Sequence, residues 1–179
     1  LNEAPYENEF RISVPIDFSL NPIEHPELMS QTITDRIIEA IENSAFDFIL
    51  ANYSNLDVLA HTGNFSSCVE AIKILDSQIK KIVDIALKND AVILITSDHG
   101  NIEELINPQT GEIDTEHNSN PVPLYLIGKE FYHRKFPNYI NLRNETLGLL
   151  SDVAPTILEI FNIPKPNEMT GNSLLSNLF

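Results

Sequence analysis

A seven-residue stretch, ITSDHGN at residues 95–101, constrains the fold of this chain more than any other feature. It overlaps a short apolar run, residues 91–95, which is bounded by polar residues and therefore predicts a buried β-strand. The strand ends at Asp98 and His99, two side chains that can bind a metal ion. Ligand sites in open α/β sheets lie at this carboxyl edge. We therefore expect a site where this strand ends.

Helical and extended patterns alternate along the chain. Apolar residues at every fourth position, such as Ile33, Ile37 and Ile41, predict an amphipathic helix. We expect helices over residues 27–43, 66–88 and 152–161, a short helix over 102–106, and strands over 46–52, 91–96 and 122–127. This alternation predicts an α/β fold with a mainly parallel sheet and helices on both faces. Residues 1–26 predict an irregular N-terminal extension, in which residues 10–15 could pair with a sheet edge.

Charge and composition exclude several classes of function. The 179-residue chain has 11 basic and 26 acidic residues and a net charge of −15, which argues against nucleic acid or an anionic membrane as partner. A phosphate ester would need bound metal ions to supply positive charge. The sequence has neither a long apolar run nor a signal-peptide pattern, so we expect a cytoplasmic location. The single cysteine, Cys68, lies on the apolar stripe of a predicted helix and is expected to be buried.

Three segments bring carboxylates and imidazoles to predicted strand ends. Asp57 and His61 are four residues apart, so one helical turn would place them on the same face. Asp98 and His99 follow a strand, and His117 lies in a loop over residues 115–121. Mixed Asp and His ligands suit Mn²⁺ or Zn²⁺, whereas an oxygen-only site would suit Mg²⁺ or Ca²⁺. Two such ions could stabilise both the attacking and the leaving oxygen of a phosphoryl transfer.

Each of these residues also has an ordinary structural interpretation. A single Asp57 is more often a helix cap than a ligand, and a single His117 more often a surface loop residue. His25 and His133 have no acidic or turn setting, and we assign them no site. Spacing alone leaves both interpretations of the remaining histidines open.

Five segments resemble the motifs of one enzyme family. The segment NYSNLDVLAHTG (residues 52–63) resembles the N-x-x-x-x-D-x-x-x-H-[ST]-G motif of cofactor-independent (2,3-bisphosphoglycerate-independent) phosphoglycerate mutases. ITSDHGN resembles their ITADHGN, with Ser97 in place of alanine. TEHNSNPVP (residues 115–123), SDVAPTIL (151–158) and EMTGNSL (168–174) resemble three further motifs, and all five occur in the family's order.

The resemblance implies an alkaline-phosphatase-like α/β fold and a two-metal centre. Asp57, His61 and His117 would bind one Mn²⁺, and Asp98 and His99 would bind the second; Zn²⁺ or another divalent ion is an alternative. Residues 27–179 would form the C-terminal part of the phosphatase-type domain, which would be incomplete on its N-terminal side.

The resemblance also implies an activity that this chain does not carry out alone. The family interconverts 3- and 2-phosphoglycerate in glycolysis through a phosphoserine, and the serine precedes the part matched here. We therefore expect no catalytic nucleophile in this chain, which would be an inactive fragment of an isomerase. Ser54, Thr62 and Ser97 adjoin the predicted ligands, but we expect none of them to replace the missing serine. The full-length protein is expected to be a monomer that binds phosphoglycerate, and we hypothesise that the fragment self-associates.

One departure from the family leaves other functions open. The family tends to carry a substrate-facing lysine in a segment that corresponds to residues 15–21, which contain none; the first lysine here is Lys73. One alternative is another two-metal phosphatase, phosphodiesterase or phosphopentomutase of the alkaline-phosphatase superfamily. A second alternative is a catalytically dead metal-binding or partner-binding domain.

Overall fold

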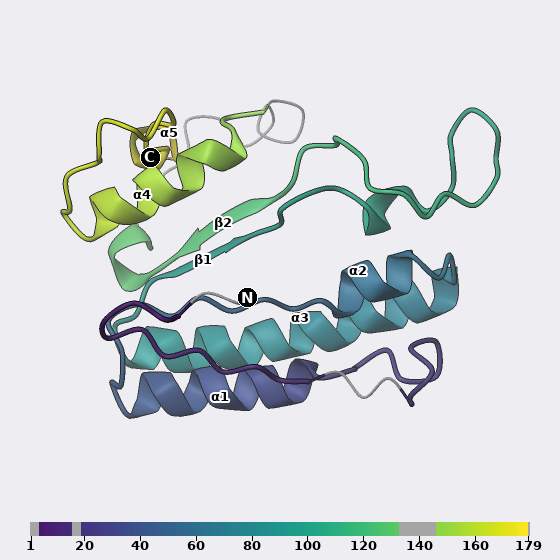
Figure 1. Cartoon of the computed structure of the whole chain (residues 1–179), viewed down its shortest axis with the longest axis horizontal. Coiled ribbons are helices and arrows are strands. Elements are labelled where there is room, and N and C mark those ends of the chain that lie inside the picture. Colours follow the sequence, from purple (N-terminus) through teal and green to yellow (C-terminus); the bar gives the residue numbers. More distant parts are fainter. Residues whose placement is uncertain (1–3, 16–18, 133–145, 179) are drawn as a thin grey trace.

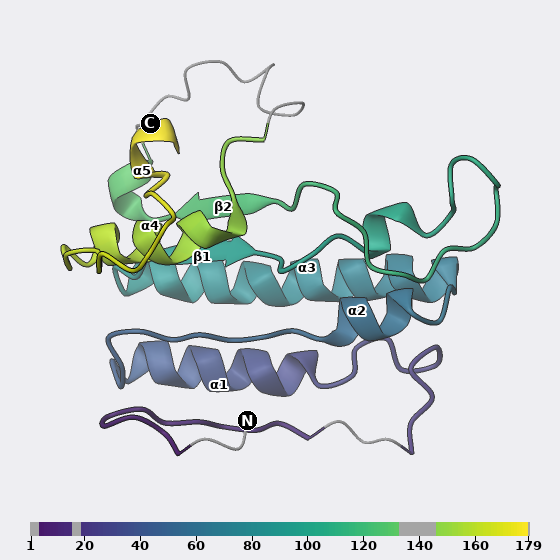
Figure 2. The same cartoon turned by 45° about the horizontal axis from the view of Figure 1, so that its top comes forward.

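The computed structural model describes residues 4–15, 19–132 and 146–178. Its α-helices are α1 (Ser30–Glu42), α2 (Asn55–Ala60), α3 (Phe65–Lys88), α4 (Val153–Ile160) and α5 (Leu175–Leu178), and its strands are β1 (Ile93–Thr96) and β2 (Leu124–Ile127). The two strands form a small sheet with α1 and α3 on one side and α4 and α5 on the other (Figures 1 and 2). The chain thus has the predicted α/β organisation, with helices on both faces.

Helices α1 and α3 pack against each other, as their apolar faces require. They confirm the helices predicted over residues 27–43 and 66–88, with ends that differ by at most three residues. Helix α4 likewise confirms the prediction for residues 152–161, whereas the short helix predicted at 102–106 is a single 3-10 turn, η1 (Ile102–Glu104).

The buried core lies where α2, α3 and η1 meet. It contains Leu59, Ala60, Cys68, Ala71 and Leu105. The predicted burial of Cys68 is confirmed, and burial raises the pKa of its thiol. This core supports the two segments that carry Asp57 and the residues following β1. The loops of the predicted site therefore rest on this buried core.

The pairing of β1 with β2 corrects the predicted sheet. The two strands are antiparallel, with Ile93 opposite Ile127 and Thr96 opposite Leu124, and this ladder is the whole sheet in the described residues. A parallel neighbour would need a crossover long enough to return the chain to the starting edge. Between β1 and β2 the described chain has only η1 and irregular loops, so the second strand runs back along the first.

Residues 46–52, predicted as a strand, are extended but unpaired. Within the described part of the chain, no backbone hydrogen bond joins residues 46–53 to another segment. The side chain of Leu50 is 85% exposed. Two aromatic contacts join this segment to other parts of the chain. The ring of Phe46 lies against that of Phe10, and the ring of Phe48 meets that of Phe161 edge to face. The prediction of a strand is therefore wrong for this structure, because no described segment offers the backbone partner that a strand needs.

The N-terminal region before α1 contains turns but no helix or strand in residues 4–15 and 19–29. The extended piece at 10–15 contacts residue 46 through a ring and does not pair with a sheet edge. The division between an extension at 1–26 and a domain at 27–179 stays a prediction. Among the described helices, none has both the length and the apolar character needed to span a bilayer.

Candidate metal centre

Helix α2 positions Asp57 and His61. Its apolar side, including Leu59 and Ala60, is buried against α3, which turns the other side toward solvent. The predicted one-turn spacing is confirmed, because the His61 backbone N–H donates to the Asp57 carbonyl. The His61 Nε2 atom lies 3.4 Å from Asp57 Oδ1, and both side chains are nearly half exposed.

A backbone carbonyl orients the His61 ring. Its Nδ1 lies 2.8 Å from the carbonyl oxygen of Thr115, which can only accept a hydrogen bond. This contact favours the tautomer with the proton on Nδ1 and leaves the Nε2 lone pair directed at the centre. The Thr115 carbonyl is thus a contributor that the sequence did not reveal.

The loop after β1 brings His99 toward α2. Gly100 pairs with Asn118 in an isolated antiparallel bridge, in which the Asn118 N–H donates to the Gly100 carbonyl at 2.9 Å. A side chain at position 100 would collide with Asn118 and Glu103, so this close approach requires glycine. The bridge ties the segment that follows β1 to the loop that contains His117.

His117 lies at the centre of the cluster. Its Nε2 is 3.1 Å from Asp57 Oδ1 and 3.1 Å from His61 Nε2. Its ring stacks on that of His99, with the centroids 3.6 Å apart. Four of the five predicted ligands therefore converge, although they come from three separate segments.

Asp98 lies at the edge of this cluster. Its carboxylate is 86% exposed and lies 3.6 Å from His99 Nε2. The pair is close enough to act together, but no contact joins Asp98 to Asp57 among the interactions of the described residues. The structure thus brings Asp98 beside His99 and leaves it more open to solvent than the other predicted ligands.

The donor atoms fit a divalent cation. One donor atom each from Asp57, His99 and His117 lies within 4.8 Å of the others. Ligands that share one tetrahedral ion with bonds of about 2.1 Å would be roughly 3.4 Å apart. The separations among Asp57, His61 and His117, 3.1 to 3.4 Å, match that spacing. An imidazole and carboxylate set also has the chemistry of Mn²⁺, Co²⁺ or Zn²⁺ sites.

A match to a protein-family model shows which family the chain belongs to. Residues 2–165 match the family model described as the metalloenzyme superfamily. The chain belongs to the metalloenzyme superfamily.

Individual relatives of this chain are phosphoglycerate mutases. It is 41% identical over 173 residues to the 2,3-bisphosphoglycerate-independent phosphoglycerate mutase of Pseudomonas putida (strain GB-1), covering 97% of this chain and 32% of that protein. It is 42% identical to 2,3-bisphosphoglycerate-independent phosphoglycerate mutase 2 of Methanosarcina barkeri, covering 97% of this chain and 31% of that protein. The chain spans about a third of the length of these curated relatives.

A solved structure supports the fold. The chain matches Leishmania mexicana phosphoglycerate mutase, crystallised at low cobalt concentration, with a TM-score of 0.73. The match covers 89% of this chain and 30% of that one, at 23% sequence identity. This likeness confirms the alkaline-phosphatase-like α/β fold class expected from the sequence motifs.

Two hydroxyl groups near the candidate metal centre donate to backbone carbonyls. The Ser97 hydroxyl donates to the His99 carbonyl at 2.9 Å, and the Thr62 hydroxyl donates to the Leu59 carbonyl at 2.6 Å. Each of the two hydroxyl groups therefore has a hydrogen-bond partner in the backbone. That the chain lacks its own nucleophile stays a prediction.

The sequence did not single out the polar residues around the cluster. Asn101 donates from Nδ2 to Asp57 Oδ1 at 3.1 Å, and Glu103 accepts from the Asn101 backbone N–H at 2.8 Å. The available signal was the position of Asn101 directly after the Asp-His-Gly turn. His25 lies outside the cluster and contacts Glu27, and His133 lies outside the described residues.

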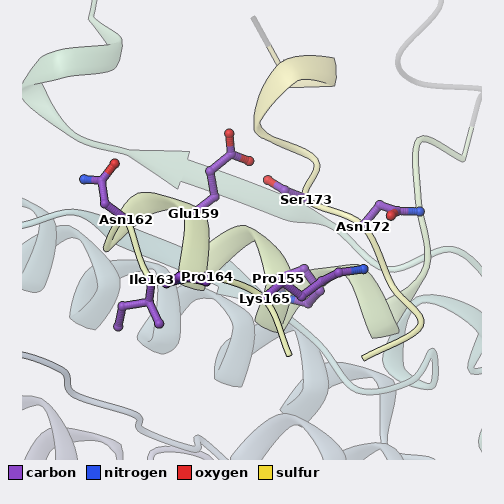
Figure 3. A pocket seen from close by; sticks show the side chains of 8 residues that line it. All are labelled: Pro155, Glu159, Asn162, Ile163, Pro164, Lys165, Asn172 and Ser173. Carbon is purple, nitrogen blue, oxygen red and sulfur yellow. The ribbon is translucent and has the colours of Figure 1, made fainter. Parts of the chain in front are cut away.

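A hollow elsewhere in the chain is lined by none of the five predicted metal ligands. It has a volume of about 440 Å³ and lies between α4 and the C-terminal tail (Figure 3). It is lined by Pro155, Glu159, Asn162, Ile163, Pro164, Lys165, Asn172 and Ser173. The Lys165 ammonium donates to the Gly171 carbonyl, so it links this tail to itself. Donor chemistry, rather than concavity, therefore identifies the candidate site.

Proposed function

We propose that this chain is the C-terminal metal-binding part of a cytoplasmic, cofactor-independent phosphoglycerate mutase. The whole protein would interconvert 3- and 2-phosphoglycerate in glycolysis through a phosphoserine that lies outside this chain. The single observation that carries the proposal is the convergence of Asp57, His61 and His117 in a chain 41% identical to such a mutase.

The proposed centre holds two Mn²⁺ ions, with Zn²⁺ or Co²⁺ as alternatives. Asp57, His61 and His117 would bind one ion, and Asp98 and His99 the other. The bound ions would stabilise the negative charge of a transferring phosphoryl group. The chain itself has a net charge of −15 and offers little positive charge for this purpose. Cobalt was present when the Leishmania mexicana enzyme was crystallised, and a mixed imidazole and carboxylate set suits that ion as well.

The residues of this chain would prepare the site rather than attack the substrate. The Thr115 carbonyl holds the His61 ring so that Nε2 faces the centre. The stacked rings of His99 and His117 restrict each other's rotation. This support reduces the conformational freedom that the ligands must lose when they bind a cation.

The test is an assay of the full-length protein with 3-phosphoglycerate, before and after removal of metal. We expect Mn²⁺ to restore mutase activity, and we expect substitutions of His61 or His117 by alanine to remove it. The 179-residue chain alone should give no turnover above a metal-free control. Turnover by this chain alone would contradict the proposal that the nucleophile lies elsewhere.

A second candidate function follows from the absence of lysine in residues 15–21. It is that of another two-metal phosphatase, phosphodiesterase or phosphopentomutase of the same superfamily. A panel of phosphate mono- and diesters, assayed with the full-length protein, separates these activities. Faster hydrolysis of a panel member than isomerisation of 3-phosphoglycerate would favour the second candidate.

A further inference from the structure

Asn101 connects the loop after β1 to helix α2. Its side chain is 5% exposed, and its Nδ2 donates to Asp57 Oδ1 across 3.1 Å. Its own Oδ1 is buried and has no hydrogen-bond partner among the described residues. One end of this amide therefore contacts a predicted ligand, while the other end is left unsatisfied.

The unsatisfied oxygen indicates which contact determines the orientation of the amide. A buried carbonyl without a partner costs free energy, so another interaction must offset it. Rotation of the amide by half a turn would place Oδ1 against the Asp57 carboxylate, where two acceptors would repel each other. The orientation of Asn101 thus serves Asp57 rather than its own hydrogen bonding.

The backbone of Asn101 is held independently of its side chain. Its N–H donates to Glu103 Oε2 at 2.8 Å, and Glu103 Oε1 accepts from Asn120 Nδ2 at 3.0 Å. Asn120 in turn donates its backbone N–H to Asn118 Oδ1, next to His117. The amide therefore projects from a fixed main chain, and a side-chain substitution at 101 leaves this network in place.

A carboxylate oxygen can accept more than one hydrogen bond, because it has two lone pairs. Asp57 Oδ1 uses one direction for Asn101 and faces His117 Nε2 with another. We propose that Asn101 is a positioning residue: it fixes the Asp57 carboxylate in the orientation in which Asp57, His61 and His117 bind a metal ion. This role rests on the metal centre proposed above. Loss of this donor should weaken metal binding without weakening the fold.

The test compares Asn101→Leu with Asn55→Leu in the full-length protein. Leucine has nearly the shape of asparagine, and at position 101 it removes both the donor and the unsatisfied oxygen. Asn55 is the matched control: it is 3% exposed, it has an unsatisfied Oδ1, and its Nδ2 contacts the Pro26 carbonyl instead of a predicted ligand. The readouts are Mn²⁺ affinity from the electron paramagnetic resonance signal of the free ion, the Co²⁺ absorption spectrum, and the Tm of the metal-free protein.

We expect Asn101→Leu to weaken Mn²⁺ binding roughly 10- to 100-fold, the usual effect of removing a residue that supports a ligand. Its Co²⁺ spectrum should change, its metal-free Tm should be kept, and Asn55→Leu should bind Mn²⁺ normally. Asn101→Ser, whose hydroxyl is too short to reach Asp57, should show the same loss and serves if the leucine variant does not fold.

Two results would overturn the inference while leaving the proposed function intact. One is unchanged Mn²⁺ affinity in Asn101→Leu or Asn101→Ser. The other is an equal loss in Asn55→Leu, which would assign the effect to buried amides in general. If the unsubstituted protein binds no Mn²⁺ or Co²⁺, the proposed function fails, and the role of Asn101 fails with it.

Discussion

His61 and His117 direct their Nε2 atoms at each other across 3.1 Å, although 56 positions separate them in the chain. Both nitrogens also lie within 3.4 Å of the same Asp57 oxygen. Two neutral imidazole lone pairs would repel each other at this distance. A bound cation shared by the two nitrogens and the Asp57 oxygen removes that repulsion.

Metal binding should therefore stabilise the fold. A ligand that binds only the folded state at a hundredfold excess over Kd adds roughly 2.7 kcal/mol to the free energy of unfolding. We expect Mn²⁺ to raise the Tm of the 179-residue chain, and we expect His61→Ala and His117→Ala to lose that increase. Differential scanning calorimetry across a Mn²⁺ titration measures it.

His25→Ala is the control for this experiment, because the hydrogen bond that the His25 side chain makes in the described structure is with the nearby Glu27 and with no predicted ligand. It should keep the full Mn²⁺-dependent increase in Tm. An increase that survives in both His61→Ala and His117→Ala would show that the ion binds elsewhere.

Substitution of Gly63 by alanine should destabilise the fold more than substitution of Gly111. Both have left-handed backbones, with φ of +66° and +73°. Such a backbone costs an alanine roughly 1–2 kcal/mol. A Cβ at 63 would also lie 2.6 Å from Ile113 Cγ2, whereas a Cβ at 111 meets nothing within 4 Å. We expect urea denaturation to show a larger loss of unfolding free energy for Gly63→Ala than for Gly111→Ala.

The double variant Gly63→Ala/Ile113→Ala separates the two causes. It removes the overlapping methyl group, so it should recover the part of the loss that exceeds that of Gly111→Ala. Equal losses in the two single variants would mean that Ile113, which is largely exposed, moves aside without cost.

Asp152 should make the free energy of unfolding depend on pH in the acid range. Its Oδ2 accepts from the Leu149 N–H and its Oδ1 from the Asn172 N–H, each at 2.8 Å. These two hydrogen bonds, helped by the charge of Lys165 and opposed by burial, lower the pKa of Asp152 below its usual 3.8. The charged carboxylate therefore stabilises the fold above pH 3.8, and this contribution is lost as the pH falls through the lowered pKa.

An amide at position 152 has only one acceptor oxygen, so Asp152→Asn must lose one of the two hydrogen bonds. We expect a lower Tm for this variant at pH 7 and a difference from the unsubstituted chain that shrinks below pH 3.8. Asp84→Asn, which loses only an exposed contact with Lys80, is the control and should change Tm little. A pH-independent difference for Asp152→Asn would contradict the role of its charge.

Local patterns predicted the elements whose backbone hydrogen bonds are local. Helices α1 and α3 followed from four-residue apolar periodicity, and the spacing of Asp57 and His61 followed from one helical turn. The motifs also identified the three segments that meet at the candidate centre. The sequence could not show how closely they meet, because that depends on the bridge between Gly100 and Asn118 and on the stacking of two distant rings.

Strand pairing depends on partners that a local pattern does not contain. The apolar run at 46–52 predicted a strand, yet no described segment supplies its backbone hydrogen bonds. The antiparallel direction of β2 depends on the path of a long irregular connection. The amino-acid composition of that connection does not specify the path. The contact of Asn101 with Asp57 was hidden for the same reason, since it joins residues 44 positions apart.

The unpaired segment at 46–53 should make the isolated chain self-associate. It combines backbone donors and acceptors that have no partner among the described residues with an 85% exposed Leu50, and such an extended edge is a template for another strand. We expect sedimentation velocity to show a weight-average mass that rises with protein concentration. Leu50→Lys should reduce this rise, because a charge opposes pairing at an edge.

Ile113→Lys is the matched control, since Ile113 is also largely exposed but lies on the loop between η1 and His117. It should leave the concentration dependence unchanged. In a full-length protein whose additional strands cover residues 46–53, the concentration dependence should disappear. A 179-residue chain that stays monomeric at every concentration would show that its open segment is protected without a partner, and equal effects of both lysine variants would assign association to general hydrophobicity rather than to this strand.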